Sequence, residues 1–306
     1  MEQPIFIIGN GAIGKALAVF LKLQGKNVTL LRGRVDDGSS VIEKINVVLA
    51  DQRILEAEIE VTTIGRFAAL NGIVVLTSKS FGNETLASAL KPKINNSPLV
   101  ILQNGLGVEQ VFTNQAYPAV YRCVLFVTSQ VNTDGKVSFK PVAKCPIGGI
   151  SGNTGSLPEI VEYLSTPQFS FLAEENIQPI IWKKAINNSV FNSVCPLLNI
   201  DNGIFHRNVQ AQSIAREVIA ECVQIAAMAG VLLEPDEVMT NLLAISKASD
   251  GQLISTLQDI NRKRPTEIDT LNFAIVRMAG QFGKAHLVER TKLLGEMVKL
   301  KSDLNR

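Results

Sequence analysis

The chain has 306 residues, of which 46% are hydrophobic and 19% charged, and its formal net charge is +2 at neutral pH. This length allows two domains with separate cores, and the composition is that of a folded protein rather than a disordered one. The small net charge argues against a nucleic-acid-binding groove, and the absence of any run of about 18 apolar residues argues against a membrane span.

Cysteine and histidine are too few and too scattered to suggest a metal centre or a disulfide framework. The sequence has no C-x-x-C pair, and these residues stand at Cys123, Cys145, Cys195, Cys222, His206 and His286. We therefore expect free thiols, no bound metal and a soluble protein of the reducing cytoplasm. The N-terminus has no basic segment of the kind that begins a secretion signal.

The first elements are a strand, a glycine-rich turn, a helix and a second strand. Residues 4–8 form an apolar strand pattern, which runs into Gly9-Asn10-Gly11-Ala12-Ile13-Gly14. Residues 15–24 predict a helix with one apolar face, and residues 28–31 predict the second strand. A G-x-G-x-x-G motif in this context is typical of a dinucleotide-binding domain.

Each glycine of the motif has a separate physical role. Gly9 permits the tight turn, Gly11 lets the backbone approach a pyrophosphate, and Gly14 lets the helix pack closely on the strand. The free N–H groups and the partial positive charge at the helix N-terminus favour phosphate. Residues 9–14 are therefore the predicted cofactor loop. The alternative is a glycine-rich turn that binds nothing.

The residue at the end of the second strand indicates the type of cofactor. NAD-binding domains usually have Asp or Glu there, whereas this chain has Arg32, followed by Gly33 and Arg34. A guanidinium suits a 2′-phosphate, which it holds with two parallel hydrogen bonds, so we expect NADPH. Two alternatives stay open. Asp36 or Asp37 takes the acidic role if the loop folds back, or the arginines are simply solvated.

The rest of the first half alternates apolar strands with turns and helices. A hairpin is predicted for residues 46–50 and 57–61, a helix for 86–90, and further strands for 73–76, 99–102, 122–127, 136–140 and 169–172. This pattern favours a Rossmann-type α/β fold, a doubly wound parallel sheet covered on both faces. Lys79 and Asn104 follow two of these strands, so we expect both at the cofactor crevice. Alternatively, they are a solvated lysine and part of a simple Asn-Gly turn.

From residue 179 onward the pattern is helical, so an all-α C-terminal domain is predicted. Amphipathic stretches cover residues 179–194, 208–229, 236–247, 252–262 and 266–281. We place the boundary near Glu175, between a cofactor domain at residues 1–175 and a helical substrate-binding and catalytic domain at residues 176–306. Substrate is expected in the cleft between the two domains. The helical domain could also offer an apolar face to a second copy in a homodimer.

The first of these helices carries a polar stripe. Lys184, Asn188 and Asn192 lie at i, i+4 and i+8, on one face of a helix that is otherwise largely apolar. Buried polar groups need partners, so the stripe either forms an internal hydrogen-bond network or faces a polar ligand. Further along, Pro265 suits a first helical turn. The negative charge of Glu267 in that turn would interact favourably with the positive end of the helix.

Taken in order, these motifs resemble the ketopantoate reductase family (2-dehydropantoate 2-reductases), and the likeness runs nearly from end to end. The matching positions are Gly9-Asn10-Gly11-Ala12-Ile13-Gly14, Lys79, Gln103-Asn104-Gly105, Trp182-Lys183-Lys184, Asn188, Asn192, Asn202-Gly203, Ser255, Leu257-Gln258-Asp259 and Thr266-Glu267-Ile268-Asp269. The resemblance implies an NADPH-binding Rossmann domain joined to a helical domain. It also implies reduction of a branched 2-keto acid to its 2-hydroxy acid, on the route to pantothenate and coenzyme A.

The resemblance further implies roles for single residues. Lys184 matches the catalytic lysine, and Lys79, Asn104 and Glu267 match residues around the cofactor and the reacting carbonyl. The residues that match those holding the hydroxyl and carboxylate groups of the substrate are Asn188, Asn192, Asn202 and Ser255. A lysine ammonium near the carbonyl stabilises the developing negative charge and donates a proton, so no metal is needed.

Two departures from the family pattern bear on the substrate. Phe273 stands where the family often has glycine, and residues 286–289 read His-Leu-Val-Glu where a Thr-Pro-x-Asn segment is common. These departures leave open a second hypothesis, in which the chain is a reductase of a different 2-keto acid on the same scaffold. A third hypothesis is a regulatory module that senses NADPH without catalysis, although a sensor would not need both Lys184 and Glu267.

Overall fold

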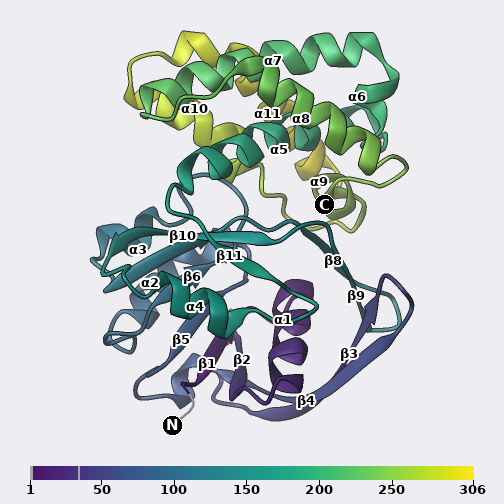
Figure 1. The fold of residues 1–306 in the computed structure, drawn as a ribbon. Coiled ribbons are helices and arrows are strands. Elements are labelled where there is room, and N and C mark those ends of the chain that lie inside the picture. Colours follow the sequence, from purple (N-terminus) through teal and green to yellow (C-terminus); the bar gives the residue numbers. More distant parts are fainter. Residues whose placement is uncertain (1–2, 34) are drawn as a thin grey trace. The chain divides into compact units, whose positions relative to one another are not determined.

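The computed structural model describes residues 3–33 and 35–306, so the predicted solvation of Arg34 lies outside the described residues. The chain divides into two compact units. The first comprises the described residues up to Asn104 together with Val108–Ile177, and the second comprises Gly105–Gly107 with Gln178–Arg306. The first is the α/β part and the second the helical part in Figure 1.

The first unit is built on one sheet, whose described strands have the order β11-β10-β7-β6-β5-β1-β2-β4-β3-β9-β8. The strands are β1 (Ile5–Ile8), β2 (Val28–Arg32), β3 (Val41–Leu49), β4 (Ile54–Thr63), β5 (Ile73–Leu76), β6 (Leu99–Ile101), β7 (Ala119–Cys123), β8 (Val127–Val131), β9 (Val137–Pro141), β10 (Cys145–Gly152) and β11 (Phe171–Ala173). The central strands, from β7 through β1 to β4, pair in parallel. The predicted class, a Rossmann-type α/β unit followed by an all-α region, is confirmed.

The sheet is mostly rather than wholly parallel. β3 with β4 and β8 with β9 form antiparallel hairpins, and β10 runs antiparallel to β7. The hairpin partners are joined by short turns at residues 50–53 and 132–136, and short connections favour antiparallel pairing. β9 pairs in parallel with β3, and its Phe139 contacts Phe20 of α1 (Ala12–Leu23), with ring centroids 5.0 Å apart. The curled sheet thus passes around α1.

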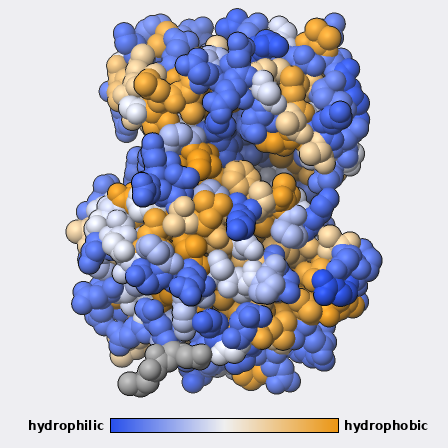
Figure 2. Space-filling model, in the orientation of Figure 1, coloured by the Kyte–Doolittle hydropathy of each residue, from blue (hydrophilic) through white to orange (hydrophobic). Residues whose placement is uncertain are grey.

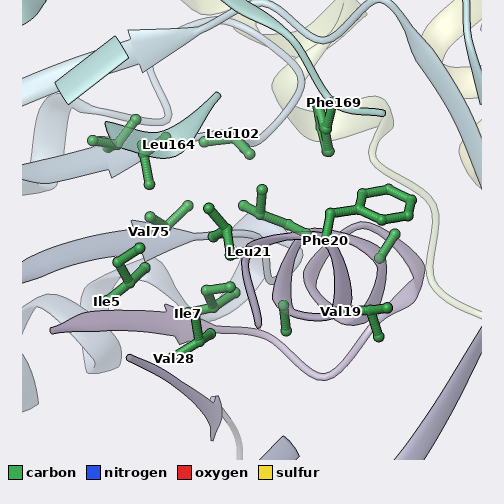
Figure 3. Packing of buried hydrophobic residues seen from close by; sticks show 14 of the residues in the cluster. Ile5, Ile7, Val19, Phe20, Leu21, Val28, Val75, Leu102, Leu164 and Phe169 are labelled. Atoms are coloured by element: carbon green, nitrogen blue, oxygen red, sulfur yellow. The ribbon is translucent and has the colours of Figure 1, made fainter. Parts of the chain in front are cut away.

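Alternate residues of β1 face opposite sides of the sheet and enter two separate hydrophobic clusters. Ile5 and Ile7 pack with residues of α1 and α4 (Leu157–Leu164), whereas Phe6 and Ile8 pack with residues of α2 (Asn83–Leu90) and α3 (Gln110–Asn114). Figure 3 shows the first cluster, where side chains of β1 and α1 converge with Phe169. Because both faces are covered, β1, β5 and β6 are apolar throughout.

Several elements lie where the sequence pattern does not indicate them, among them β10, α4 and α11 (Glu289–Leu304). In β10 two glycines hide the strand pattern, yet the packing requires both. A Cβ on Gly148 would lie 2.5 Å from the Ile177 Cβ, and one on Gly149 would lie 2.7 Å from the Thr154 Cβ. The face that helix α11 buries is not apolar in sequence, because it is made mostly of small and polar residues, namely Thr291, Gly295, Val298 and Ser302.

The second unit is a set of helices around α5 (Gln178–Leu198), which contacts α7, α8, α9 and α11 and buries most of its residues. Its other helices are α6 (Ile204–Arg207), α7 (Val209–Met228), α8 (Pro235–Ala248), α9 (Ser255–Asn261), α10 (Asn272–Gln281) and α11. Across the described residues, no helix combines the length and the apolar character needed to cross a membrane.

The helix predicted for residues 266–281 begins later than expected. Glu267 precedes a single 3-10 turn at Ile268–Thr270, and α10 starts only at Asn272. The Thr270 N–H donates to the Glu267 carbonyl oxygen at 3.0 Å, which closes the tighter turn before α10 begins. The interpretation of Glu267 as a charge in the first turn of a long helix is therefore wrong.

Candidate functional site

The glycine motif forms the turn between β1 and α1, and its three glycines differ in their surroundings. Gly9 has a φ of +127°, and a Cβ there would lie 2.5 Å from the Ser78 amide nitrogen. A Cβ on Gly14 would lie 2.0 Å from the Gly9 carbonyl oxygen. At Gly11, no described atom beyond its own neighbours in the chain lies within 4 Å of the Cβ position, so protein packing does not explain this glycine. The open space leaves room for a ligand close to the backbone, as a pyrophosphate requires.

The first turn of α1 presents its N–H groups at the same place. Gly11 is the N-cap, no side chain caps the helix, and no acidic residue lies in the first turn. The remaining loop residues are Asn10, which is exposed, and Ala12 and Ile13, which are half-buried. N–H groups at the positive end of a helix bind phosphate, so this turn can hold a dinucleotide.

Arg32, at the end of β2, is held by the loop that follows it. Its Nη2 donates to the Ser39 carbonyl oxygen at 2.7 Å, to the Ser39 hydroxyl, and to Asp37 Oδ1 at 3.3 Å. Its Nε is buried and meets no acceptor among the described residues. The guanidinium therefore keeps a donor for a ligand oxygen, although one of its nitrogens is already engaged.

The two aspartates of this loop have different partners. Asp37 Oδ1 accepts from the Ser39 hydroxyl at 2.7 Å and from the Ser39 N–H at 2.9 Å. These bonds, with a smaller contribution from Arg32, hold the pKa of Asp37 below its usual value. Asp36 instead accepts from the Gly65 N–H at 2.7 Å. Asp37 is thus the carboxylate that folds back onto Arg32.

A buried amide pair joins the chain segments that follow β5 and β6. Gln103 Nε2 donates to the Ser78 carbonyl oxygen at 2.9 Å and to Asn83 Oδ1 at 2.8 Å, and Asn83 Nδ2 donates back to Gln103 Oε1 at 2.8 Å. Lys79 is exposed and Asn104 is half-buried. Each of the two lies one residue beyond a member of this network, so the network fixes the backbone that leads to both.

An ion pair that no sequence motif indicates lies beside this network. Arg122 of β7, with 2% of its side chain exposed, pairs with Glu109 and donates to the Gln103 carbonyl oxygen at 3.3 Å. The available signal is an arginine inside an apolar strand, since a buried arginine needs a carboxylate. The pair holds the chain directly before Asn104.

The polar stripe of α5 is tied to the start of α9. Asn192 Nδ2 donates to the Asn188 carbonyl oxygen at 2.9 Å, and Asn192 Oδ1 accepts from Ser255 Oγ and from the Thr256 N–H, both at 3.2 Å. Asn192 is buried, Lys184 is half-buried and Ser255 is exposed. The structure thus brings Asn188, Asn192 and Ser255 together. For Asn192, the expectation of an internal network holds.

Glu267 is buried, with 8% of the residue exposed, at the turn before α10. The segment Gly105–Gly107 packs within the helical unit beside this turn. The Leu106 N–H donates to the Thr270 carbonyl oxygen at 2.8 Å, and a Cβ on Gly105 would lie 2.5 Å from that oxygen. The glycine that follows Asn104 is therefore required by a close backbone approach, which a simple surface turn would not need.

Asn202 and Phe273 have contrasting environments in the helical unit. Asn202 is 8% exposed, and its buried Oδ1 meets no donor among the described residues. The Phe273 ring packs against the cluster of Ile260, Ile268 and Val298, and the Lys299 Nζ lies 5.4 Å from its centroid. Packing within the unit accounts for this ring.

Within residues 3–33 and 35–306, no group of three or more His, Cys, Asp or Glu side chains is placed to hold a metal ion. All four cysteines are free and buried. Burial raises the pKa of Cys195 and of Cys222 to about 12. Thiols of this kind are neutral near pH 7 and are weak nucleophiles.

Two family descriptions match the chain. Residues 5–152 match "Ketopantoate reductase PanE/ApbA", and residues 176–302 match "Ketopantoate reductase PanE/ApbA C terminal". Together the two matches take in β1 to β10 and the helices of the second unit, except the last two residues of α11.

Curated relatives named 2-dehydropantoate 2-reductase match over nearly the whole length. The one from Pyrococcus horikoshii is 28% identical over 288 residues, which cover 90% of this chain and 91% of the relative. The one from Archaeoglobus fulgidus is 26% identical over 293 residues, which cover 95% and 96%.

Solved structures share the fold. A PanE/ApbA family ketopantoate reductase from Ralstonia eutropha has a TM-score of 0.84 at 21% identity, and D-mandelate dehydrogenase with NADH and anilino(oxo)acetate has 0.83 at 20%, each over 99% of both chains. A dimeric ketopantoate reductase from Staphylococcus aureus has 0.82 at 17% identity, over 99% of this chain and 100% of that one. These identities support the fold alone. The sequence matches on both parts go further: the chain belongs to the ketopantoate reductase family of nicotinamide-dependent oxidoreductases.

Proposed function

We propose that the chain is an NADPH-dependent reductase that converts 2-dehydropantoate (ketopantoate) to pantoate, in the synthesis of pantothenate and coenzyme A. One observation carries the proposal: both parts of the chain match the family, and Lys184, which matches the family's catalytic lysine, lies on the polar stripe of α5. The roles proposed for the other site residues follow the same match.

The domain predicted at residues 1–175, which corresponds to most of the first unit, is proposed to bind the cofactor. The open space at Gly11 and the first turn of α1 suit a pyrophosphate, and Lys79 brings a positive charge to the end of β5. Asn104 is assigned to the cofactor near the reacting carbonyl. A bound nicotinamide cofactor would supply the hydride.

Arg32 is proposed to bind a 2′-phosphate, which is why we favour NADPH. Its buried Nε needs an acceptor, since an unsatisfied buried donor costs roughly 1–3 kcal/mol. The Asp37 carboxylate acts in the opposite direction, because it lies on the same guanidinium and would repel a phosphate. Asp37 would instead accept from the 2′-hydroxyl of NADH. The loop after β2 is thus proposed to set the balance between the two cofactors.

The domain predicted at residues 176–306, which contains the second unit except Gly105–Gly107, is proposed to bind and protonate the keto acid. When hydride adds to the keto carbon, negative charge develops on the oxygen, and Lys184 Nζ stabilises that charge and donates the proton. The residues proposed to bind the hydroxyl and carboxylate groups are Asn188, Asn192, Asn202 and Ser255. Asn192 Nδ2 has two hydrogens and uses one on the Asn188 carbonyl oxygen, so one is left for substrate. Glu267 is proposed to orient the lysine or the cofactor.

The deciding experiment measures oxidation of NADPH by the purified protein with ketopantoate, beside pyruvate and 2-ketoisovalerate, and repeats each with NADH. We expect fast turnover with ketopantoate and NADPH. Turnover with only one of the other keto acids would change the assigned substrate, and Lys184 would remain the proposed proton donor. This second candidate is favoured by one observation, since a similar fold is found in D-mandelate dehydrogenase and the fold therefore does not choose the acid. Tight NADPH binding without oxidation would favour the sensing module.

We also infer that the protein forms a homodimer through α11. Four apolar residues lie at i, i+4, i+7 and i+11 and expose between 47% and 78% of their surfaces, namely Leu293, Met297, Leu300 and Leu304. This spacing forms one face that suits packing against another helix. Figure 2 shows separate hydrophobic patches on a mainly hydrophilic surface. A dimeric structure of similar fold supports a second copy as the partner.

Light scattering during size-exclusion chromatography tests the dimer. The unaltered protein should elute as a dimer and Leu300→Glu as a monomer, with unchanged circular dichroism. A monomeric unaltered protein at micromolar concentration would refute the inference.

We propose a cytoplasmic location on the basis of the thiols. All four cysteines are free and buried, which suits a reducing compartment. Cell fractionation with a tagged chain tests this location.

A further inference from the structure

The loop between α5 and α6 holds one polar group that the helical unit leaves unused. The Asn202 N–H donates to the Gln252 carbonyl oxygen at 2.9 Å, and the Asn202 carbonyl oxygen accepts from Ser246 Oγ at 2.7 Å. The backbone is thus fixed, while the buried Oδ1 meets no described donor. Burying an oxygen without a hydrogen bond destabilises a fold, so the retention of this oxygen points to a donor on a ligand.

Asp201, directly before Asn202, anchors the loop. Asp201 Oδ1 accepts from the Gly203 N–H at 2.7 Å and from the Gly251 N–H at 3.2 Å. Arg207 Nη2 reaches both carboxylate oxygens, each at 2.8 Å. The bonds from Arg207 and the two amides lower the pKa of Asp201 to about 2, so the carboxylate is charged throughout the neutral range.

Arg207 joins this loop to the segment after α8. Its Nη1 donates to Asp250 Oδ1 while its Nη2 holds Asp201. Asp250 lies so close to the loop that a Cβ on Gly203 would be 1.9 Å from Asp250 Oδ1. Glycine at 203 therefore lets the carboxylate come within reach of the guanidinium. An arginine bound by two carboxylates fixes geometry better than a single surface ion pair does.

We propose that Arg207 is a positioning residue, which holds Asp201 and Asp250 together and so aims the Asn202 carboxamide at a hydroxyl of the substrate. A hydroxyl is the matching group, because Oδ1 accepts a hydrogen bond and an ionised carboxylate has no proton to donate. Arg207 acts through the loop rather than on the substrate. This inference rests on the function proposed above, and it separates Asn202 from the residues that would bind the carboxylate.

The test is Arg207→Gln, with kcat and KM measured for ketopantoate and for 2-ketoisovalerate, which lacks the hydroxyl. We expect KM for ketopantoate to rise about tenfold, the effect of losing roughly one hydrogen bond, with kcat nearly unchanged. KM for 2-ketoisovalerate should not change. A purely structural role would lower the amount of active enzyme for both substrates and leave both KM values alone. Arg207→Lys keeps the charge without the bidentate geometry and should give an intermediate KM.

Arg216→Gln is the matched control, because Arg216 makes a single exposed ion pair with Asp236 at 3.7 Å in the same unit. It should leave all four constants unchanged. Should Arg207→Gln not fold, Asp250→Asn keeps the pair with Asp201 and should raise KM for ketopantoate by a smaller factor. Equal KM values for ketopantoate in the unaltered and Arg207→Gln enzymes would overturn the inference.

A second readout separates failure of the inference from failure of the proposed function. Absence of ketopantoate turnover in the unaltered enzyme would remove the proposed function and the substrate role of Asn202. Hydrogen exchange of the Gly203 and Gly251 amides still reports on the ion pairs of Arg207 with Asp201 and Asp250, since both amides donate to Asp201. We expect faster exchange of both amides in Arg207→Gln. Unchanged exchange would overturn the claim that Arg207 holds this loop in place.

Discussion

The two proposed binding regions are built in different ways. In the glycine loop, the groups expected to meet a ligand are backbone N–H groups, placed by Gly9 and Gly14 in positions where no Cβ fits. On α5, the groups are side chains whose partners come from distant parts of the chain, as Asn192 shows with Ser255 and Thr256. A backbone site can be recognised from a short motif, whereas a side-chain site depends on tertiary packing.

The largest effects on stability should come from the glycine loop, where two glycines of one motif can be compared. Gly14→Ala places a Cβ 2.0 Å from a backbone oxygen, so we expect it to destabilise the first unit by about 3 kcal/mol or more. The added methyl group of Gly11→Ala meets no described atom within 4 Å beyond its neighbours in the chain, so its stability should stay within about 0.5 kcal/mol of the unaltered protein. Urea unfolding measures both.

Gly11→Ala should nonetheless bind NADPH about tenfold more weakly, because a methyl group blocks close approach of the pyrophosphate. Fluorescence titration of NADPH measures this affinity. Equal affinity in Gly11→Ala would contradict the backbone site, and equal stability in Gly14→Ala would contradict the packing argument.

On the side-chain site, Lys184→Ala should lower kcat by roughly 10²–10⁴-fold, the usual contribution of a general acid. Its NADPH affinity should persist, because the cofactor loop is in the other unit. Lys183→Ala is the control, since Lys183 is paired with Glu237 and has no proposed role in catalysis. Steady-state kinetics with ketopantoate measure the difference, and full activity in Lys184→Ala would rule out the lysine as proton donor.

Asn192→Ala should have a moderate effect on stability. It removes the bonds that join α5 to α9, so we expect a loss of roughly 1–3 kcal/mol in the free energy of unfolding. Asn188→Ala is the control, because Asn192 bonds to the backbone oxygen of Asn188 and not to its side chain. Similar losses in the two variants would show that the hydrogen bonds of the Asn192 side chain do not contribute specifically to stability.

The smallest effect should come from Asp37→Asn, which removes a negative charge beside Arg32. We expect the ratio of kcat/KM for NADPH to that for NADH to rise only roughly fivefold, because solvent screens the exposed pair of Asp37 and Arg32. Asp36→Asn serves as control, because Asp36 is bonded to Gly65 instead. A fall in the ratio would mean that Asp37 orders Arg32 for the phosphate rather than competing with it.

Two segments of the helical unit depart from their local sequence pattern for the same reason. Glu267 reads as part of a helix because Ile268, Leu271 and Ile275 have helical spacing, yet the Glu267–Thr270 hydrogen bond closes a 3-10 turn first. Helix α11 is not indicated because its buried face is made of small and polar residues. In both segments, tertiary contacts outweigh the local hydrophobic period.

The sequence by itself determined the glycine loop, the apolar strands β1, β5 and β6, and the polar stripe of α5. These features depend on backbone geometry and side-chain periodicity within a few turns of chain, so they can be recognised locally. Only the tertiary structure decided that Asp37 rather than Asp36 lies on Arg32 and that Arg122 is neutralised by Glu109. It also decided that no described donor reaches the buried Oδ1 of Asn202. Which polar partner a side chain binds depends on which segments packing brings within about 3 Å of it. A local sequence pattern does not contain that information.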